Sequence, residues 1–227
     1  GKNVIAVGNV SSTDAIANSS SRGPALDGRI KPDICAVGSS VYSTVDPNNY
    51  QLKSGTSMAC PGVAGVLAQL YHAYKTNNGG VNPNAALMKA SILNTAEDLG
   101  NVGPDYTHGW GRINARRAYN LVNNNNYFYG TIAQGDNNNH NITVPAGTSP
   151  LRVMVYWTDY EGAASAAPAL VNDINMQVVD PASTTHNPWV LTPSSPNNAA
   201  TQGVDALNNM EQVTIDNPTS GTYSVNL

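Results

Sequence analysis

The pattern of hydrophobic residues changes once along this chain, near residues 123–126, and that change constrains the fold more than any other feature. Before it, short apolar runs alternate with helix-length segments, a pattern typical of α/β domains. We therefore predict an α/β domain with a parallel sheet over residues 1–122, called the first half below. The predicted elements are strands at Val4–Val10 and Ile34–Val37, and helices at Thr56–Tyr74, Pro83–Thr95 and Ile113–Leu121.

Beyond residue 126 the hydrophobic pattern has the two-residue period of strands. Runs such as Leu151–Trp157 and Ile174–Val179 alternate with loops rich in Asn, Pro, Ser and Gly, and no long helical pattern occurs. This predicts an all-β sandwich or jelly-roll domain over residues 127–227, called the second half below. The four asparagines at 123–126 contain no apolar residue and are the predicted linker.

Composition and charge exclude two classes of partner. The net charge is -4, and no cluster of basic residues exceeds the pair Arg116 and Arg117, so the basic surface of a nucleic-acid-binding protein is missing. The longest apolar stretch, Val63–Leu70, is far shorter than the ~20 residues that span a membrane. We expect a soluble protein with no nucleic acid and no membrane among its partners.

The first residues do not have the order of a signal peptide. Val4–Val7 is a short apolar run that ends at Gly8, which is typical of a buried strand. We therefore expect the chain to begin inside a domain.

The residues that suggest chemistry are concentrated in Ser54–Gly65, whose sequence is SGTSMACPGVAG. Ser57 is predicted at the start of a helix, after a tight turn, with Pro61 in the first helical turn. A hydroxyl there lies at the positive end of the helix, and the Ser57 N–H is free to face an oxyanion. An ordinary N-cap serine remains the alternative, although a cap alone does not require so many small neighbours.

This segment resembles the nucleophile motif of the subtilisin-like serine proteases, the subtilases. The resemblance covers about the first 120 residues, because the flanking segments also occur in the family's order. The second half resembles, more weakly, the C-terminal jelly-roll domain of some alkaline subtilases. The matching segments are Gly1–Gly8, Ser19–Pro24, Asp27–Gly38 and His108–Ala115 in the first half, and Leu170–Ile174 and Asn208–Val225 in the second.

The resemblance implies that Ser57 is the nucleophile of a secreted endopeptidase that cleaves protein or peptide substrates. In the family a histidine takes the serine proton and an aspartate holds that histidine. Those two motifs, and the oxyanion asparagine, precede the region matched here. We therefore expect an upstream segment of the same protease as the partner that carries Asp and His, and we expect this chain to be inactive alone.

The four histidines of the chain agree with this expectation. His72 is predicted on the same helix as Ser57, roughly 22 Å along its axis at about 1.5 Å per residue. His108 belongs to a turn, and His140 and His186 lie in polar loops of the second half. Two other functions stay open: a non-catalytic pseudoprotease fragment, and a β-sandwich binding module.

Three further features are interpreted through the resemblance. Cys35 and Cys60 are expected on neighbouring elements, so a disulfide is open, although two buried free thiols are favoured. Met58 follows the nucleophile, where its oxidation would place a polar sulfoxide beside Ser57. Asp159 and Asp173 are predicted at strand ends, where members of this architecture bind calcium, and solvated loop acids are the alternative.

Overall fold

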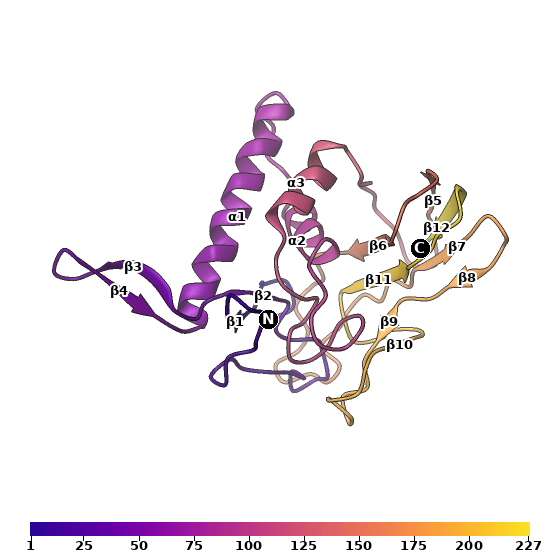
Figure 1. The fold of residues 1–227 in the computed structure, drawn as a ribbon. Coiled ribbons are helices and arrows are strands. Elements are labelled where there is room, and N and C mark those ends of the chain that lie inside the picture. Colours follow the sequence, from indigo (N-terminus) through magenta and orange to yellow (C-terminus); the bar gives the residue numbers. More distant parts are fainter.

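The computed structural model describes residues 1–227 (Figure 1). In the first half, β1 (Val7–Val10) and β2 (Ile34–Val37) form a parallel pair in which Val7 lies opposite Ile34. The helix α1 (Thr56–Asn77) packs against both strands, and the helices α2 (Ala85–Asn94) and α3 (Ala115–Asn123) pack against α1. The prediction that the first half combines strands with helices is confirmed.

The predicted elements of the first half all occur, with small shifts at their ends. Strand β1 begins at Val7 rather than Val4, because the preceding backbone makes other contacts: the Ala6 N–H donates to the Asp33 carboxylate at 2.7 Å. Helix α1 continues to Asn77, past the expected end at Tyr74. None of the helices is long and apolar enough to cross a membrane.

A β-hairpin that the sequence did not predict precedes α1. Its strands β3 (Val41–Val45) and β4 (Asn49–Lys53) pair antiparallel, and Figure 1 shows the hairpin projecting from the body of the molecule at the left. Tyr42 and Tyr50 stack on it with ring centroids 5.5 Å apart, yet both side chains are exposed. The hairpin therefore has no buried face.

The second half contains strands and loops, and no helix follows α3. Strands β6 and β11 form one antiparallel pair, β9 and β10 another, and β5, β12, β7 and β8 form a four-stranded sheet. Apolar residues of β5, β7, β11 and β12 share one buried cluster. The jelly-roll arrangement itself stays a prediction. The strands are β5 (Asn139–Val144), β6 (Leu151–Tyr156), β7 (Gln177–Val179), β8 (Thr185–His186), β9 (Trp189–Val190), β10 (Thr201–Gln202), β11 (Met210–Ile215) and β12 (Gly221–Asn226).

The larger hydrophobic cluster contains residues of both halves. Ile30 and Ile34 belong to the same cluster as Leu191 and Met210. The Trp110 indole N–H lies 3.2 Å from the Met210 sulfur, and α2 packs against β6. The division into two domains at residues 123–126 stays a prediction, and this packing shows that the two predicted halves share buried surface.

Candidate active site

Ser57 lies in the first turn of α1, and its side chain is exposed. The N-cap of the helix is Gly55, which supplies no side-chain hydrogen bond, and the Ser57 hydroxyl makes no hydrogen bond to another protein group. The N-cap alternative for Ser57 is therefore wrong, because this hydroxyl does not cap the helix. An exposed hydroxyl with no structural partner is available for chemistry.

The backbone around Ser57 presents positive charge beside that hydroxyl. The N–H groups of Met58 and Ala59 donate to the Gly55 carbonyl at 3.0 and 3.3 Å. The Ser57 N–H precedes them, and no backbone carbonyl accepts from it. The first N–H groups of a helix carry the positive end of its dipole, so this amide can donate to an oxygen that becomes negative.

Close backbone packing under the turn fixes where α1 begins. The Gly38 N–H donates to the Val10 carbonyl at 3.0 Å, and the Gly55 N–H donates to the Gly38 carbonyl at 2.9 Å. A Cβ on Gly38 would lie 2.6 Å from the Gly55 oxygen and 2.8 Å from the Ala59 Cβ. The chain therefore needs glycine at 38, a requirement that the sequence pattern did not identify.

Asn9 is a second residue under this turn that sequence reasoning missed. It is 1% exposed at the end of β1, and its amide oxygen accepts from the Ser39 hydroxyl at 3.2 Å. The Ser40 N–H in turn donates to the Ser54 hydroxyl at 2.8 Å. These contacts connect β1 to the segment that leads into Ser57.

One face of α1 is open along the helix that begins at Ser57. Only four of its residues are buried, and the small residues around Ala64 are exposed. A Cβ on Gly62 or Gly65 would meet no atom within 4 Å. Pro61 lies inside the helix rather than in its first turn, so the Ser57 carbonyl lacks its usual i+4 donor. The buried residues are Ala59, Val63, Leu70 and Tyr74.

Three of the four histidines of this chain have side-chain partners away from Ser57. His108 Nδ1 lies 3.3 Å from the Asp105 carboxylate, which also accepts the N–H groups of Thr107 and His108 and so stabilises a turn. His186 pairs with Asp180 at 3.2 Å, and the His140 ring stacks on Phe128. No hydrogen bond or ion pair joins these three side chains to Ser57, and the expectation that histidine and aspartate come from an upstream segment stays a prediction.

Cys35 and Cys60 are both free thiols. Cys35 is buried, and burial, with the Asp105 carboxylate adding to it, raises the pKa of its thiol to about 12. Cys60 is exposed on the open face of α1, so the expectation of two buried thiols is wrong for this residue. The reason is that no other element of this chain covers that side of the helix.

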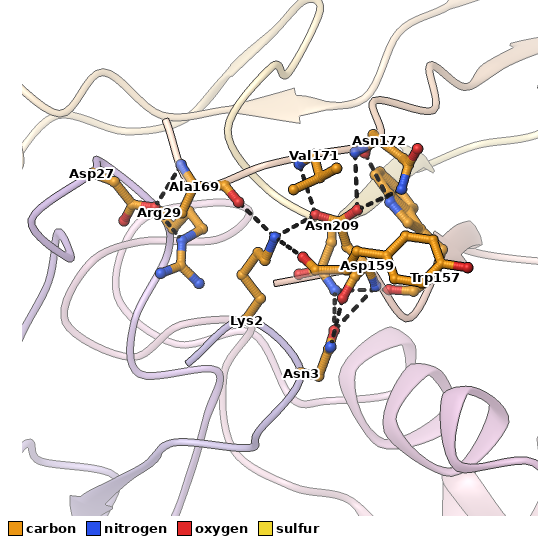
Figure 2. Close-up of polar contacts among 11 residues, drawn as sticks. Lys2, Asn3, Asp27, Arg29, Trp157, Asp159, Ala169, Val171, Asn172 and Asn209 are labelled. Carbon is orange, nitrogen blue, oxygen red and sulfur yellow. Dashed lines mark hydrogen bonds and ion pairs between the residues drawn. The ribbon is translucent and has the colours of Figure 1, made fainter. Parts of the chain in front are cut away.

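Asp159 is buried and already carries a full set of protein partners (Figure 2). Its carboxylate pairs with the Lys2 ammonium at 2.6 Å and accepts the N–H groups of Val171 and Asn172 at 2.8 and 2.9 Å. Burial alone would raise its pKa, but the Lys2 ammonium and these N–H donors hold the pKa below its ordinary value.

These contacts do not fit a calcium ion on Asp159, because the ammonium already neutralises the carboxylate. Asp173 is not among its partners, and burial raises the pKa of Asp173. No group of three or more His, Cys, Asp and Glu side chains lies close enough to hold a metal ion. Calcium binding through Asp159 and Asp173 stays a prediction that rests on resemblance alone.

The chain is similar in sequence to known proteases. The model of the subtilase family matches residues 1–111. The minor extracellular protease Vpr of Bacillus subtilis is 38% identical over 141 residues, which cover 55% of this chain and 16% of Vpr. The human membrane-bound transcription factor site-1 protease is 36% identical over 126 residues, or 53% of this chain and 12% of that protein.

A solved structure is also similar to part of this chain. The CspB protease of Clostridium perfringens has 30% sequence identity and a TM-score of 0.49, and the match covers 53% of this chain and 27% of that one. The chain spans less than a fifth of the length of the two curated relatives described above. The sequence matches and the motif around Ser57 lead to one conclusion: residues 1–111 of this chain belong to the subtilase family.

Proposed function

We propose that this chain carries the nucleophile of a serine endopeptidase that cleaves protein or peptide substrates through an acyl-enzyme on Ser57. The observation that supports this most directly is the state of Ser57 in the first turn of α1. Its hydroxyl is exposed and unbonded, and its own backbone N–H donates to no backbone carbonyl. Membership of residues 1–111 in the subtilase family supports the assignment of this serine as the nucleophile.

In the proposed reaction, the Ser57 oxygen attacks the scissile carbonyl carbon. A histidine takes the hydroxyl proton and later gives it to the leaving amine, while an aspartate orients that histidine. The Ser57 N–H donates to the carbonyl oxygen as that oxygen becomes negative. Water then attacks the ester carbon, releases the acyl product and restores the hydroxyl.

The histidine and aspartate are proposed to come from an upstream segment of the same protease that packs on the open face of α1. This face begins at Ser57 and continues over Ala64 and Gly65, whose small size leaves room for another backbone. Burial of this face would also bring the segment next to the nucleophile. Packing of such a segment would explain why this face of α1 carries small residues, since no contact within this chain requires them.

The location and the second half are part of the same proposal. The relative from Bacillus subtilis is named an extracellular protease, and we propose secretion for the protein that contains this chain. We propose a jelly roll for residues 127–227, in which the cluster around Tyr223 is the interior.

A chimera tests the function. Residues 1–111 would replace the matching region of Vpr, so that the preceding part of Vpr supplies the family's histidine and aspartate. A fluorophosphonate probe should label Ser57 of the chimera, as identified by peptide mass spectrometry, and the Ser57→Ala chimera should stay unlabelled. A folded chimera that is not labelled, alongside labelled Vpr, would favour a non-catalytic scaffold.

A further inference from the structure

Two of the linker asparagines, Asn123 and Asn125, help to line a pocket between α1 and α3, which pack side by side (Figure 1). The pocket has a volume of about 140 Å³. Leu70, Ala73 and Val122 are its apolar residues, the rest are asparagines and tyrosines, and no charged residue lines it. A pocket of this composition suits an uncharged ligand that has both polar groups and an apolar surface.

Hydrogen bonds within the protein orient the side-chain amides of Asn77 and Asn123, which both line the pocket. Asn77 Nδ2 donates to Asn123 Oδ1 at 2.8 Å, and the Tyr119 hydroxyl donates to the same oxygen at 3.3 Å. The Asn77 oxygen and the Asn123 amide nitrogen bond to no protein group. This pair therefore offers a ligand one acceptor and one donor group whose positions are fixed in advance.

Asn78 and Asn125 also use only one end of their amides. Asn78 Nδ2 donates to the Tyr74 carbonyl at 2.8 Å, and Asn125 Oδ1 accepts from the Tyr127 hydroxyl at 3.3 Å. The Asn78 oxygen and the Asn125 nitrogen are left for a ligand, so free acceptors and free donors occur in equal number around the pocket. A hydroxyl group both donates and accepts, whereas a carboxylate only accepts and an ammonium only donates. The four amides therefore match a ligand with several hydroxyl groups.

The volume of the pocket is that of one ring. A cavity of about 150 Å³ binds benzene, so 140 Å³ is enough for a six-membered ring. A pyranose has C–H groups on its two faces and hydroxyl groups around its edge. The C–H groups can pack on Leu70, Val122 and the Tyr119 ring, which is 42% exposed, while the hydroxyls bond to the amides.

We propose that this pocket binds an uncharged pyranose unit of a carbohydrate. It lies at the C-terminal end of α1, where Asn77 is roughly 30 Å from Ser57 along the helix axis at about 1.5 Å per residue. A saccharide bound there would leave the Ser57 end of the helix open. The site would therefore hold the protein on a glycan without blocking a peptide substrate, and the inference does not depend on the peptidase function.

NMR titration of the ¹⁵N-labelled 227-residue chain tests the proposal, because the spectra include the asparagine side-chain NH₂ groups. The probes are the methyl α-glycosides of glucose, mannose, galactose and N-acetylglucosamine. At least one should bind with a Kd of about 1 mM, as expected for a ligand of this size, and shift the NH₂ signals of Asn123 and Asn125. Sodium acetate and N-acetylglycine methylamide, which carry a carboxylate and a peptide unit instead of hydroxyl groups, should not bind there.

Asn123→Ala removes both the free NH₂ group and the oxygen that holds Asn77, so the Kd should rise about tenfold or more. The matched control is Asn120→Ala, which removes an exposed asparagine of the same helix that does not line the pocket, and its Kd should stay within about twofold of the natural value. Both variants should keep their melting temperature, because alanine has the higher helix propensity.

Three results would overturn the proposal. In the first, none of the glycosides binds with a Kd below about 50 mM. In the second, acetate or the peptide unit binds the pocket as tightly as the glycosides do. In the third, Asn123→Ala binds the glycosides like the natural chain.

Discussion

Ser57 combines an exposed hydroxyl with a helix-start N–H, and nothing else in the chain uses either group. Since the N-cap of α1 is Gly55, the Ser57 hydroxyl does not cap the helix. The role proposed for the residue is therefore chemical, because its hydroxyl makes no contact that stabilises the fold. This separation makes its substitution informative.

Ser57→Ala should leave the stability of the chain within about 0.5 kcal/mol of the natural value, as is usual for exposed positions without special contacts. In an assembled enzyme the same change should remove fluorophosphonate labelling. Urea unfolding measures the first effect, and labelled-peptide mass spectrometry the second. A loss of stability of about 2 kcal/mol would show that the hydroxyl is structural after all.

Glu211 is a buried carboxyl whose ionisation opposes folding. One of its oxygens accepts the Met176 N–H at 2.6 Å, and the other has no partner. Burial raises its pKa to about 8, and the Asp205 and Asp173 carboxylates act in the same direction. From about pH 4.3, the ordinary glutamate pKa, to about pH 8, the unfolded chain releases this proton and the folded chain keeps it, so stability falls as pH rises.

Glu211→Gln keeps an oxygen for the Met176 N–H and removes the ionisation. The free energy of unfolding of the variant, relative to the natural chain, should rise between pH 5 and pH 8 by at most about 1.4 kcal/mol per pH unit and then level off. Urea unfolding across this range measures it, with Glu161→Gln as the exposed control. Parallel stability curves for Glu211→Gln and the natural chain would mean that Glu211 ionises normally in the fold.

Sequence reasoning singled out Ser57 as the predicted nucleophile, but not the residues beneath it. Ser57 stands in a run of small residues that is informative by itself. Asn9 and Gly38 act through contacts between β1, the turn after β2 and Gly55, which are distant in sequence. Only the folded backbone brings these segments together, so no local pattern could reveal them.

At the scale of elements, α1 is the helix whose sequence and surroundings disagree. Its small residues allow close packing, yet they face solvent in this chain. We expect a larger side chain there to be harmless to the chain alone and harmful to its assembly with a segment that supplies histidine and aspartate.

Gly65→Leu tests this expectation, because a Cβ at 65 meets no atom within 4 Å. Leucine also has a higher helix propensity than glycine, by roughly 0.7 kcal/mol, so the melting temperature of the chain alone should not fall. Labelling of Ser57 in the Vpr chimera should fall at least tenfold. The control for added apolar surface is Gln69→Leu, at another exposed position of the helix. Equal labelling of the Gly65→Leu chimera and the unmodified chimera would show that no segment packs on this face.

The helices could be predicted because each is a helix-length segment that lies between short apolar runs or turn residues, whereas the hairpin of β3 and β4 could not. An alternating pattern identifies a strand when one of its faces is buried. Here Tyr42, Tyr50 and Leu52 are apolar and exposed. The hairpin has no buried face, so its sequence has no alternation of buried and exposed residues that would identify its strands.

At the scale of the whole molecule, the two predicted halves pack through a common core. The linker asparagines suggested separate domains, but Ile30 and Met210 lie in one cluster. The Arg152 guanidinium also donates to the Ala96 carbonyl at 2.8 Å, and the Gln212 amide donates to the Asn94 side chain at 2.9 Å. Contacts over such sequence separations leave no local signal, so the shared core could not be predicted.

Met210→Ala should therefore weaken the first half as well as the second. Met210 is 3% exposed, and its truncation should cost about 2–5 kcal/mol. The buried Cys35 thiol reports on the first half, and its reaction with a thiol reagent should become faster in the variant. Cys60→Ser provides a background without the exposed thiol; unchanged Cys35 protection in a destabilised Met210→Ala chain would show that the halves unfold independently.

The central claim is that this chain contributes the nucleophile and depends on another segment for the histidine and aspartate. Without a base, the Ser57 hydroxyl stays protonated and is a poor nucleophile. The most direct measurement is the rate of peptide hydrolysis by the purified chain, before and after it is mixed with the part of Vpr that precedes the matched region. We predict no enzymatic hydrolysis by the chain alone, and hydrolysis after mixing that Ser57→Ala abolishes. Hydrolysis by the chain alone that depends on Ser57 would contradict the claim.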